Sequence, residues 1–133
     1  MDKTQKTIFL VDDDFDYLVQ QKIMLESKGF NIIMAEGEKQ AKEILNNSLF
    51  DLAIVDLMME NMDTGFIICH EIKKKHPAIP IIMATAVASQ TGFEFDSITN
   101  AEKKWIKADS VITKPIRSEQ LLKEIQKLLK NEL

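Results

Sequence analysis

The first apolar run of the chain is Thr7-Ile8-Phe9-Leu10-Val11, and it leads directly into Asp12-Asp13-Asp14. Isoleucine, phenylalanine and valine favour β-strands, and a strand that is buried on both faces is apolar throughout rather than in alternation. The run therefore predicts an interior strand of a parallel sheet, with three carboxylates at its carboxyl end.

Further apolar runs of strand length recur along the chain, at residues 30–35, 52–55, 80–84 and 111–112. Segments with apolar residues at steps of three and four are typical of helices, and they lie at 14–28, 38–47, 66–75 and 101–108, with a last helix capped by Ser118. Strands that alternate with helices predict a parallel sheet covered by helices on both faces, which is an α/β fold of one domain.

Length and composition limit the class of protein. The chain of 133 residues has the size of one domain, and its 45% hydrophobic and 29% charged residues are typical of a soluble globular protein. Cys69 is the single cysteine, so an internal disulfide is excluded, and the polar start resembles neither a secretion signal nor a membrane span. We expect a cytoplasmic protein without membrane insertion. The net charge of -4 argues against direct nucleic-acid binding.

Polar residues follow the expected strands, at the edge where ligand sites form in open parallel sheets. These residues are Asp12, Asp13, Asp14, Asp56, Thr85 and Lys114. Clustered carboxylates repel one another unless a cation neutralises them, and Mg²⁺ prefers oxygen ligands. An aspartate beside such an ion can act as a nucleophile toward phosphorus, while the hydroxyl and the ammonium hold phosphoryl oxygens. Asp14 alone is explained equally well as a helix N-cap.

Short motifs around these residues resemble those of two-component response-regulator receiver domains. They are residues 10–14, 55–59, 62–63, 84–86 and 113–115. The resemblance covers residues 6 to 131, in the order that the family has. It implies a single receiver domain over residues 1–133 with a flavodoxin-like (βα)5 fold, in which five parallel strands have the order 2-1-3-4-5.

The resemblance also implies a function, namely acceptance of a phosphoryl group from the phosphohistidine of a sensor histidine kinase or a phosphotransfer protein. The implied site residues are Asp56 as phosphoacceptor, Asp12, Asp13, Asp56 and the backbone carbonyl of Met58 as Mg²⁺ ligands, and Lys114 and Thr85 as phosphate-binding groups. Such a domain catalyses only its own phosphorylation and dephosphorylation. Its output is a change in contacts with a downstream protein, and a homodimer is left open.

The sequence departs from the family pattern at several positions. Thr64 replaces a usual glycine, and Val111 replaces a usual aromatic residue, so we expect a valine that simply fills a strand. The segment between Thr85 and Lys114 is longer than usual. Apolar Met58 and Val87 flank the expected phosphate, so we expect slow hydrolysis.

Two other interpretations remain open at this point. A Mg²⁺-dependent phosphatase of the haloacid-dehalogenase type also carries an acidic motif after its first strand, but it would leave Asp56 without a role. A pseudo-receiver would bind partners without phosphorylation. The intact set of Asp13, Asp56, Thr85 and Lys114 argues against it.

Overall fold

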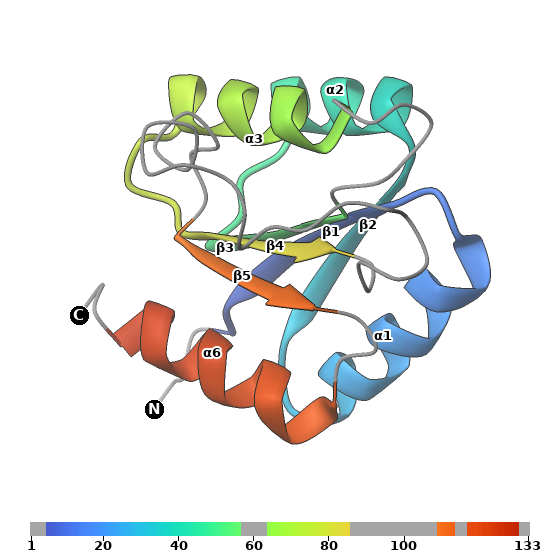
Figure 1. Ribbon diagram of the computed structural model, residues 1–133, viewed down its shortest axis with the longest axis vertical. Helices are drawn as coiled ribbons and strands as arrows, with labels where there is room; N and C mark the ends of the chain where they lie inside the picture. Colours follow the sequence, from blue (N-terminus) through green and yellow to red (C-terminus); the bar gives the residue numbers. More distant parts are fainter. Residues whose placement is uncertain (1–4, 57–63, 86–108, 114–116, 131–133) are drawn as a thin grey trace.

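A computed structural model describes residues 5–56, 64–85, 109–113 and 117–130 (Figure 1). The strands are β1 (Thr7–Asp12), β2 (Asn31–Glu36), β3 (Leu52–Asp56), β4 (Ile81–Thr85) and β5 (Ser110–Thr113). The helices are α1 (Phe15–Ser27), α2 (Glu38–Asn47), α3 (Thr64–Lys75) and α6 (Ser118–Lys130). The five strands form one parallel sheet in the order β2-β1-β3-β4-β5, which confirms the expected topology.

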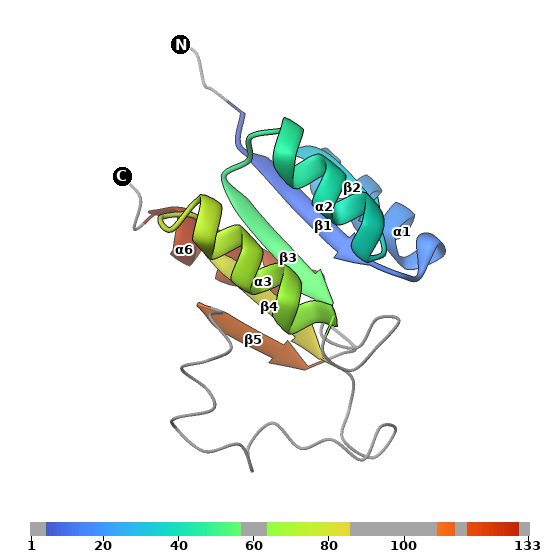
Figure 2. The same ribbon diagram turned by 90° about the horizontal axis from the view of Figure 1, so that it is seen from above.

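The sheet lies between two layers of helices. Helices α2 and α3 cover one face, and α1 and α6 cover the other (Figures 1 and 2). Successive side chains of a strand point to opposite faces, so each strand contributes to both layers. In β1, Phe9 and Val11 belong to the hydrophobic cluster under α2 and α3, whereas Ile8 and Leu10 belong to the cluster over α1 and α6.

Within the described residues, the expected strands and helices agree with the structure, apart from shifts of one or two residues at their ends. Helix α3 begins at Thr64 rather than at residue 66, and Thr64 and Gly65 are both buried. The prediction that Ser118 caps the last helix is wrong. The Leu121 N–H donates to the Arg117 carbonyl at 3.0 Å, so Arg117 is the cap and Ser118 the first helical residue. The helix expected at 101–108 lies outside the described residues.

Only some of the apolar residues of helix α1 face the sheet. Leu18 and Leu25 are buried against the sheet, but Phe15 is 52% exposed and Ile23 is 63% exposed. Helix α1 ends before Gly29, which has a φ of 97°, a conformation that glycine adopts without strain. The rotation of α1 about its axis is therefore set by the side chains that pack against the sheet. The full set of its apolar residues does not set it.

Among the described residues, no helix is both long and apolar enough to span a membrane. The central strands β1 and β3 are nearly all buried, whereas the edge strand β2 has several half-buried residues. The carboxyl ends of β1 and β3 therefore lie in the middle of the sheet, where neighbouring strands surround them.

Candidate functional site

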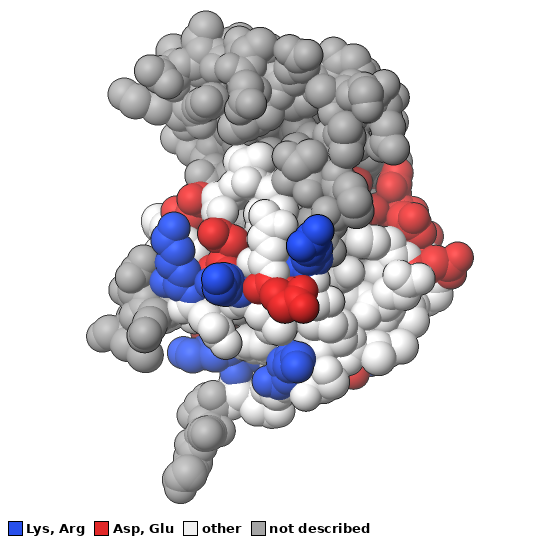
Figure 3. Space-filling view, turned by 60° about the horizontal axis from the view of Figure 1, so that its bottom comes forward, with Lys and Arg blue, Asp and Glu red and all other residues white. Residues whose placement is uncertain are grey.

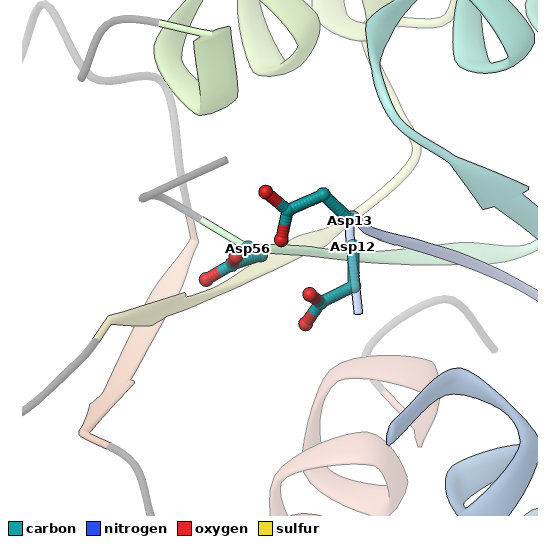
Figure 4. A group of neighbouring side chains, drawn as sticks. All are labelled: Asp12, Asp13 and Asp56. Carbon is teal, nitrogen blue, oxygen red and sulfur yellow. The ribbon is translucent and has the colours of Figure 1, made fainter. Parts of the chain in front are cut away.

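Three carboxylates converge at the carboxyl edge of the sheet. Asp12 ends β1, Asp13 follows it directly, and Asp56 ends β3 (Figure 4). One oxygen of each side chain lies within 4.8 Å of one oxygen of each of the others. Asp12 and Asp56 are buried, at 3% and 5% exposure, whereas Asp13 is exposed. The cluster therefore has a buried floor and one side open to solvent.

Strand pairing brings Asp12 and Asp56 together. β1 and β3 are adjacent and parallel, and Val11 pairs with Val55, so the next residue of each strand is an aspartate. Asp56 in turn pairs with Ala84 of β4. The register of the sheet thus places the two buried carboxylates side by side.

Backbone hydrogen bonds shape the turn from β1 into α1. The Asp14 N–H donates to Asp12 Oδ1 at 3.0 Å, an arrangement in which an aspartate stabilises a turn two residues further on. The Tyr17 N–H donates to Asp14 Oδ1 at 3.2 Å, so Asp14 is the N-cap of α1. These two bonds hold the backbone on both sides of Asp13.

The donor set fits a hard divalent cation. Carboxylate oxygens are the ligands that Mg²⁺ prefers, and two ligands on opposite sides of an octahedral Mg²⁺ are about 4.2 Å apart. The three carboxylates lie within 4.8 Å of one another, so a small adjustment or a bound water lets one ion contact all of them. Two unit negative charges at this separation repel by roughly 3 kcal/mol at an effective dielectric constant of about 20. A cation relieves that repulsion.

The other expected site residues are described only in part. Thr85 ends β4, and its backbone pairs with Thr113 of β5, so both strands end at the same edge as the carboxylates. Met58 and Lys114 lie outside the described residues, as does Val87. Asp14 acts as a helix cap and is not part of the carboxylate cluster that the described residues form.

The sequence did not single out Gln21, which lies beside the cluster. Gln21 lines a small cavity together with Asp12 and Asp56. Leu18, Gln21 and Leu25 have the three- and four-residue spacing of one helix face, but the sequence alone does not show that this face is the buried one. A glutamine between two buried leucines on that face marks a polar side chain directed toward the sheet.

Several remaining residues have structural rather than functional surroundings. Val111 is half-buried against the cluster under α2 and α3, which confirms that it fills a strand position. His70 is exposed, whereas His76 is half-buried, because its ring packs edge-on against Phe50 with a centroid separation of 5.8 Å. Cys69 is fully buried, and burial raises the pKa of its thiol to about 12.

The response regulator receiver domain model matches residues 8–126 of the chain. The chain therefore belongs to the response regulator receiver domain family, the family to which its motifs point. Receiver domains act as phosphoacceptors in two-component signalling, and they generally bind Mg²⁺ at an acidic pocket. Neither the phosphatase nor the pseudo-receiver interpretation is favoured.

Similar proteins include regulators that are longer than this chain. The chain is 33% identical over 123 residues to the transcriptional regulatory protein CpxR of Escherichia coli (strain K12), covering 92% of this chain and 49% of CpxR. It is 37% identical over 82 residues to the transcriptional regulatory protein ZraR of the same strain, covering 62% of this chain and 18% of ZraR. The chain thus spans about half or less of the length of these relatives.

Solved structures show the same fold over nearly the whole chain. A CheY-like response regulator receiver domain protein from Methanospirillum hungatei JF-1 is 26% identical, with a TM-score of 0.81 and coverage of 97% of both chains. A two-component response regulator from Clostridium difficile is also 26% identical, with a TM-score of 0.81 and coverage of 96% of this chain and 98% of the other. The predicted flavodoxin-like fold is confirmed.

Proposed function

We propose that Asp56 is the phosphoacceptor of this receiver domain and that Asp12, Asp13 and Asp56 help to bind Mg²⁺. The observation that carries the proposal is the convergence of the three carboxylates, whose oxygens lie within 4.8 Å at the carboxyl edge of the sheet. Folding does not require charges of one sign to lie so close together. A site that binds a cation and accepts a phosphoryl group requires carboxylates that lie close together.

Asp56 supplies the nucleophile. One of its carboxylate oxygens forms a bond to phosphorus while the bond between phosphorus and the donor atom breaks. The bonding electrons leave with the donor, which is a histidine nitrogen in a phosphorylated kinase or an acetate oxygen in acetyl phosphate. Burial of Asp56 at the end of a central strand fixes its carboxylate, so little orientational freedom is lost when the donor arrives.

When bound, Mg²⁺ would offset the charge that develops on the phosphoryl oxygens. Asp12 and Asp13 would hold the Mg²⁺ ion with their carboxylates. The hydrogen bonds that Asp12 and Asp14 accept fix the turn that carries these two residues. The exposed Asp13 lies on the side open to solvent, which gives a donor a route to the site.

The remaining roles rest on the family resemblance. Thr85 and Lys114 bind the phosphoryl oxygens, and the Met58 carbonyl completes the metal ligands. The position of Thr85 at the end of β4 supports its role, because β4 is adjacent to the strand of Asp56. We propose that residues 1–133 form one receiver domain, that it is cytoplasmic and that it is not an enzyme toward other substrates.

The proposed partners are a sensor histidine kinase or phosphotransfer protein and a downstream protein, without direct nucleic-acid or membrane contact. On the described part of the face formed by α1 and α6, basic and acidic side chains are interspersed (Figure 3). Lys22 and Glu26 on α1, for example, form an ion pair of 3.0 Å. Interspersed charges support a protein partner, since nucleic-acid binding needs an excess of positive charge.

A mass measurement with a small phosphodonor tests the proposal. The protein is incubated with Mg²⁺ and acetyl phosphate, and its intact mass is compared with that of Asp56→Asn, a variant of almost the same size. We expect wild type to gain the mass of one phosphoryl group and Asp56→Asn to gain none. Asp51→Asn is the matched control, because Asp51 lies at the opposite end of β3, and it should be phosphorylated like wild type.

The other outcomes separate the alternatives. No mass gain in folded wild-type protein would indicate a pseudo-receiver. Multiple turnover of phosphomonoesters would indicate a phosphatase. A mass gain that persists in Asp56→Asn would place the phosphoryl group on another residue and overturn the assignment of Asp56.

A further inference from the structure

Gln21 carries a buried polar atom whose hydrogen-bonding capacity is unused. In the described part of the chain, two buried side-chain polar atoms have no hydrogen-bond partner, and these are Gln21 Oε1 and Thr64 Oγ1. A buried amide oxygen without a partner is unfavourable, so a polar partner for it would be strongly favoured. A cavity lies beside Gln21.

That cavity joins Gln21 to the carboxylate cluster. Its polar lining comes from Asp12, Tyr17, Gln21 and Asp56, and aliphatic side chains from β1, β3, β4, α1 and α6 close the rest. It leaves about 10 Å³ for the centre of a water molecule, which is close to the smallest space that holds one water.

The alternation of the strands explains why these groups meet. Leu10 and Ile54 belong to the hydrophobic cluster over α1 and α6, and Asp12 and Asp56 lie two residues further along the same strands. Side chains two residues apart in a strand point to the same face. Both aspartates therefore lie on the side of the sheet that α1 covers, and Gln21 lies on the inner side of that helix.

The chemistry of the groups identifies what fills the cavity. Gln21 Oε1 and a carboxylate oxygen both accept hydrogen bonds, so they cannot bond to each other directly. A water molecule has two O–H donors and can serve both acceptors at once. Sites that hold a buried water usually offer it two to four polar partners, and this cavity does so.

We infer that Gln21 holds a structural water that hydrogen-bonds to the Asp12 carboxylate, which makes Gln21 a positioning residue for the metal site. This inference rests on the proposed function, because it assigns Asp12 to the Mg²⁺ ligands. The water restrains the Asp12 carboxylate in addition to the hydrogen bond from the Asp14 N–H. Such indirect partners orient the ligands of metal sites, and their removal typically weakens metal binding.

The test replaces the amide by an unbranched apolar side chain of similar length. Mg²⁺ is titrated into wild type, Gln21→Met and Gln20→Met, and the dissociation constants are measured by calorimetry. Gln20 is the matched control, because it lies next to Gln21 on the same helix but is exposed. We expect the dissociation constant to rise about 10-fold in Gln21→Met and to stay unchanged in Gln20→Met.

An unchanged dissociation constant in Gln21→Met would overturn the inference, and so would equal weakening in both variants. A crystal structure of metal-free wild type gives a second measurement that does not depend on a variant. A water within hydrogen-bond distance of Gln21 Oε1 and the Asp12 carboxylate supports the inference, and an empty cavity overturns it. If wild type binds no Mg²⁺, the proposed metal site fails, while the water in the metal-free structure still tests the position of Gln21.

Discussion

Aspartates lie at both ends of the sheet, and their surroundings differ. At the amino end, Asp51 Oδ2 accepts from the Thr7 N–H at 2.7 Å, and Asp109 Oδ2 accepts from the Ile81 N–H at 2.8 Å. Lys73 Nζ lies 2.9 Å from the same Asp109 oxygen. At the carboxyl end, by contrast, Asp12, Asp13 and Asp56 face one another within 4.8 Å.

The difference separates a structural use of carboxylates from the functional use that we propose. Each aspartate at the amino end holds the first N–H of a strand, so its charge stabilises the fold. The carboxylates at the carboxyl end lie close enough to repel one another, and a bound cation would relieve that repulsion. Substitutions at the two ends should therefore have opposite effects on stability, and only those at the carboxyl end should weaken metal binding.

The largest effect is expected for Asp13→Asn. Loss of this proposed metal ligand should weaken Mg²⁺ binding by about 100-fold or more, since loss of an indirect partner alone typically weakens metal binding by about 10- to 100-fold. Without metal, the variant should be more stable than wild type by about 1 kcal/mol, because one repulsive charge is removed and solvent screens the exposed Asp13. Calorimetric Mg²⁺ titration and urea unfolding in EDTA measure the two effects.

Asp109→Asn is the control for Asp13→Asn at the other end of the sheet. It also replaces one carboxylate by an amide, and its Mg²⁺ affinity should equal that of wild type. A metal-free Asp13→Asn protein that is less stable than wild type would contradict the repulsion that distinguishes the two ends.

A smaller effect is expected for Asp109→Ala. The substitution removes the acceptor of the Ile81 N–H and the partner of Lys73, and it should lower the free energy of unfolding by about 2 kcal/mol. Partial exposure of the ion pair keeps the loss moderate. Urea unfolding measures this loss of stability. Asp109→Asn retains an acceptor oxygen, so its free energy of unfolding should fall by less than that of Asp109→Ala. Equal stability of Asp109→Ala and wild type would show that this carboxylate does not hold the strand.

The smallest effect concerns Cys69, which lies near the amino-end ion pair. Burial raises the pKa of its thiol from about 9 to about 12, while Lys73 lowers it and Asp109 raises it to smaller extents. Below pH 9 the thiol is neutral in both the folded and the unfolded protein, so it adds no pH dependence. Between pH 9 and 12 only the unfolded protein loses the proton, so stability falls as the pH rises.

By pH 10 this linkage should cost wild type about 1 kcal/mol relative to pH 8. Cys69→Ala loses some packing at every pH but lacks the ionisable group. Between pH 8 and pH 10, its free energy of unfolding should therefore fall by about 1 kcal/mol less than that of wild type. Urea unfolding of both proteins at pH 8 and pH 10 measures the difference. Parallel declines in the two proteins would show that the buried thiol does not resist ionisation.

Much of the site could be predicted because it depends on strand ends. The carboxyl ends of parallel strands meet at one edge whatever the details of packing, so aspartates after two apolar runs were expected to converge. The roles of Asp13 and Asp14 could not be separated in that way. Either carboxylate can follow a strand, and the hydrogen bond to the Tyr17 N–H shows that Asp14 caps the helix.

The sequence by itself determined the alternation of strands and helices, the acidic edge and the family, because each depends on local spacing and on residue type. The tertiary structure decided which residues of α1 face inward. It exposed Phe15 and Ile23 and turned Gln21 toward the cavity beside Asp12. The rotation of a helix about its own axis is set by how its side chains fit the sheet, and the apolar residues of α1 were too widely distributed around the helix to specify it.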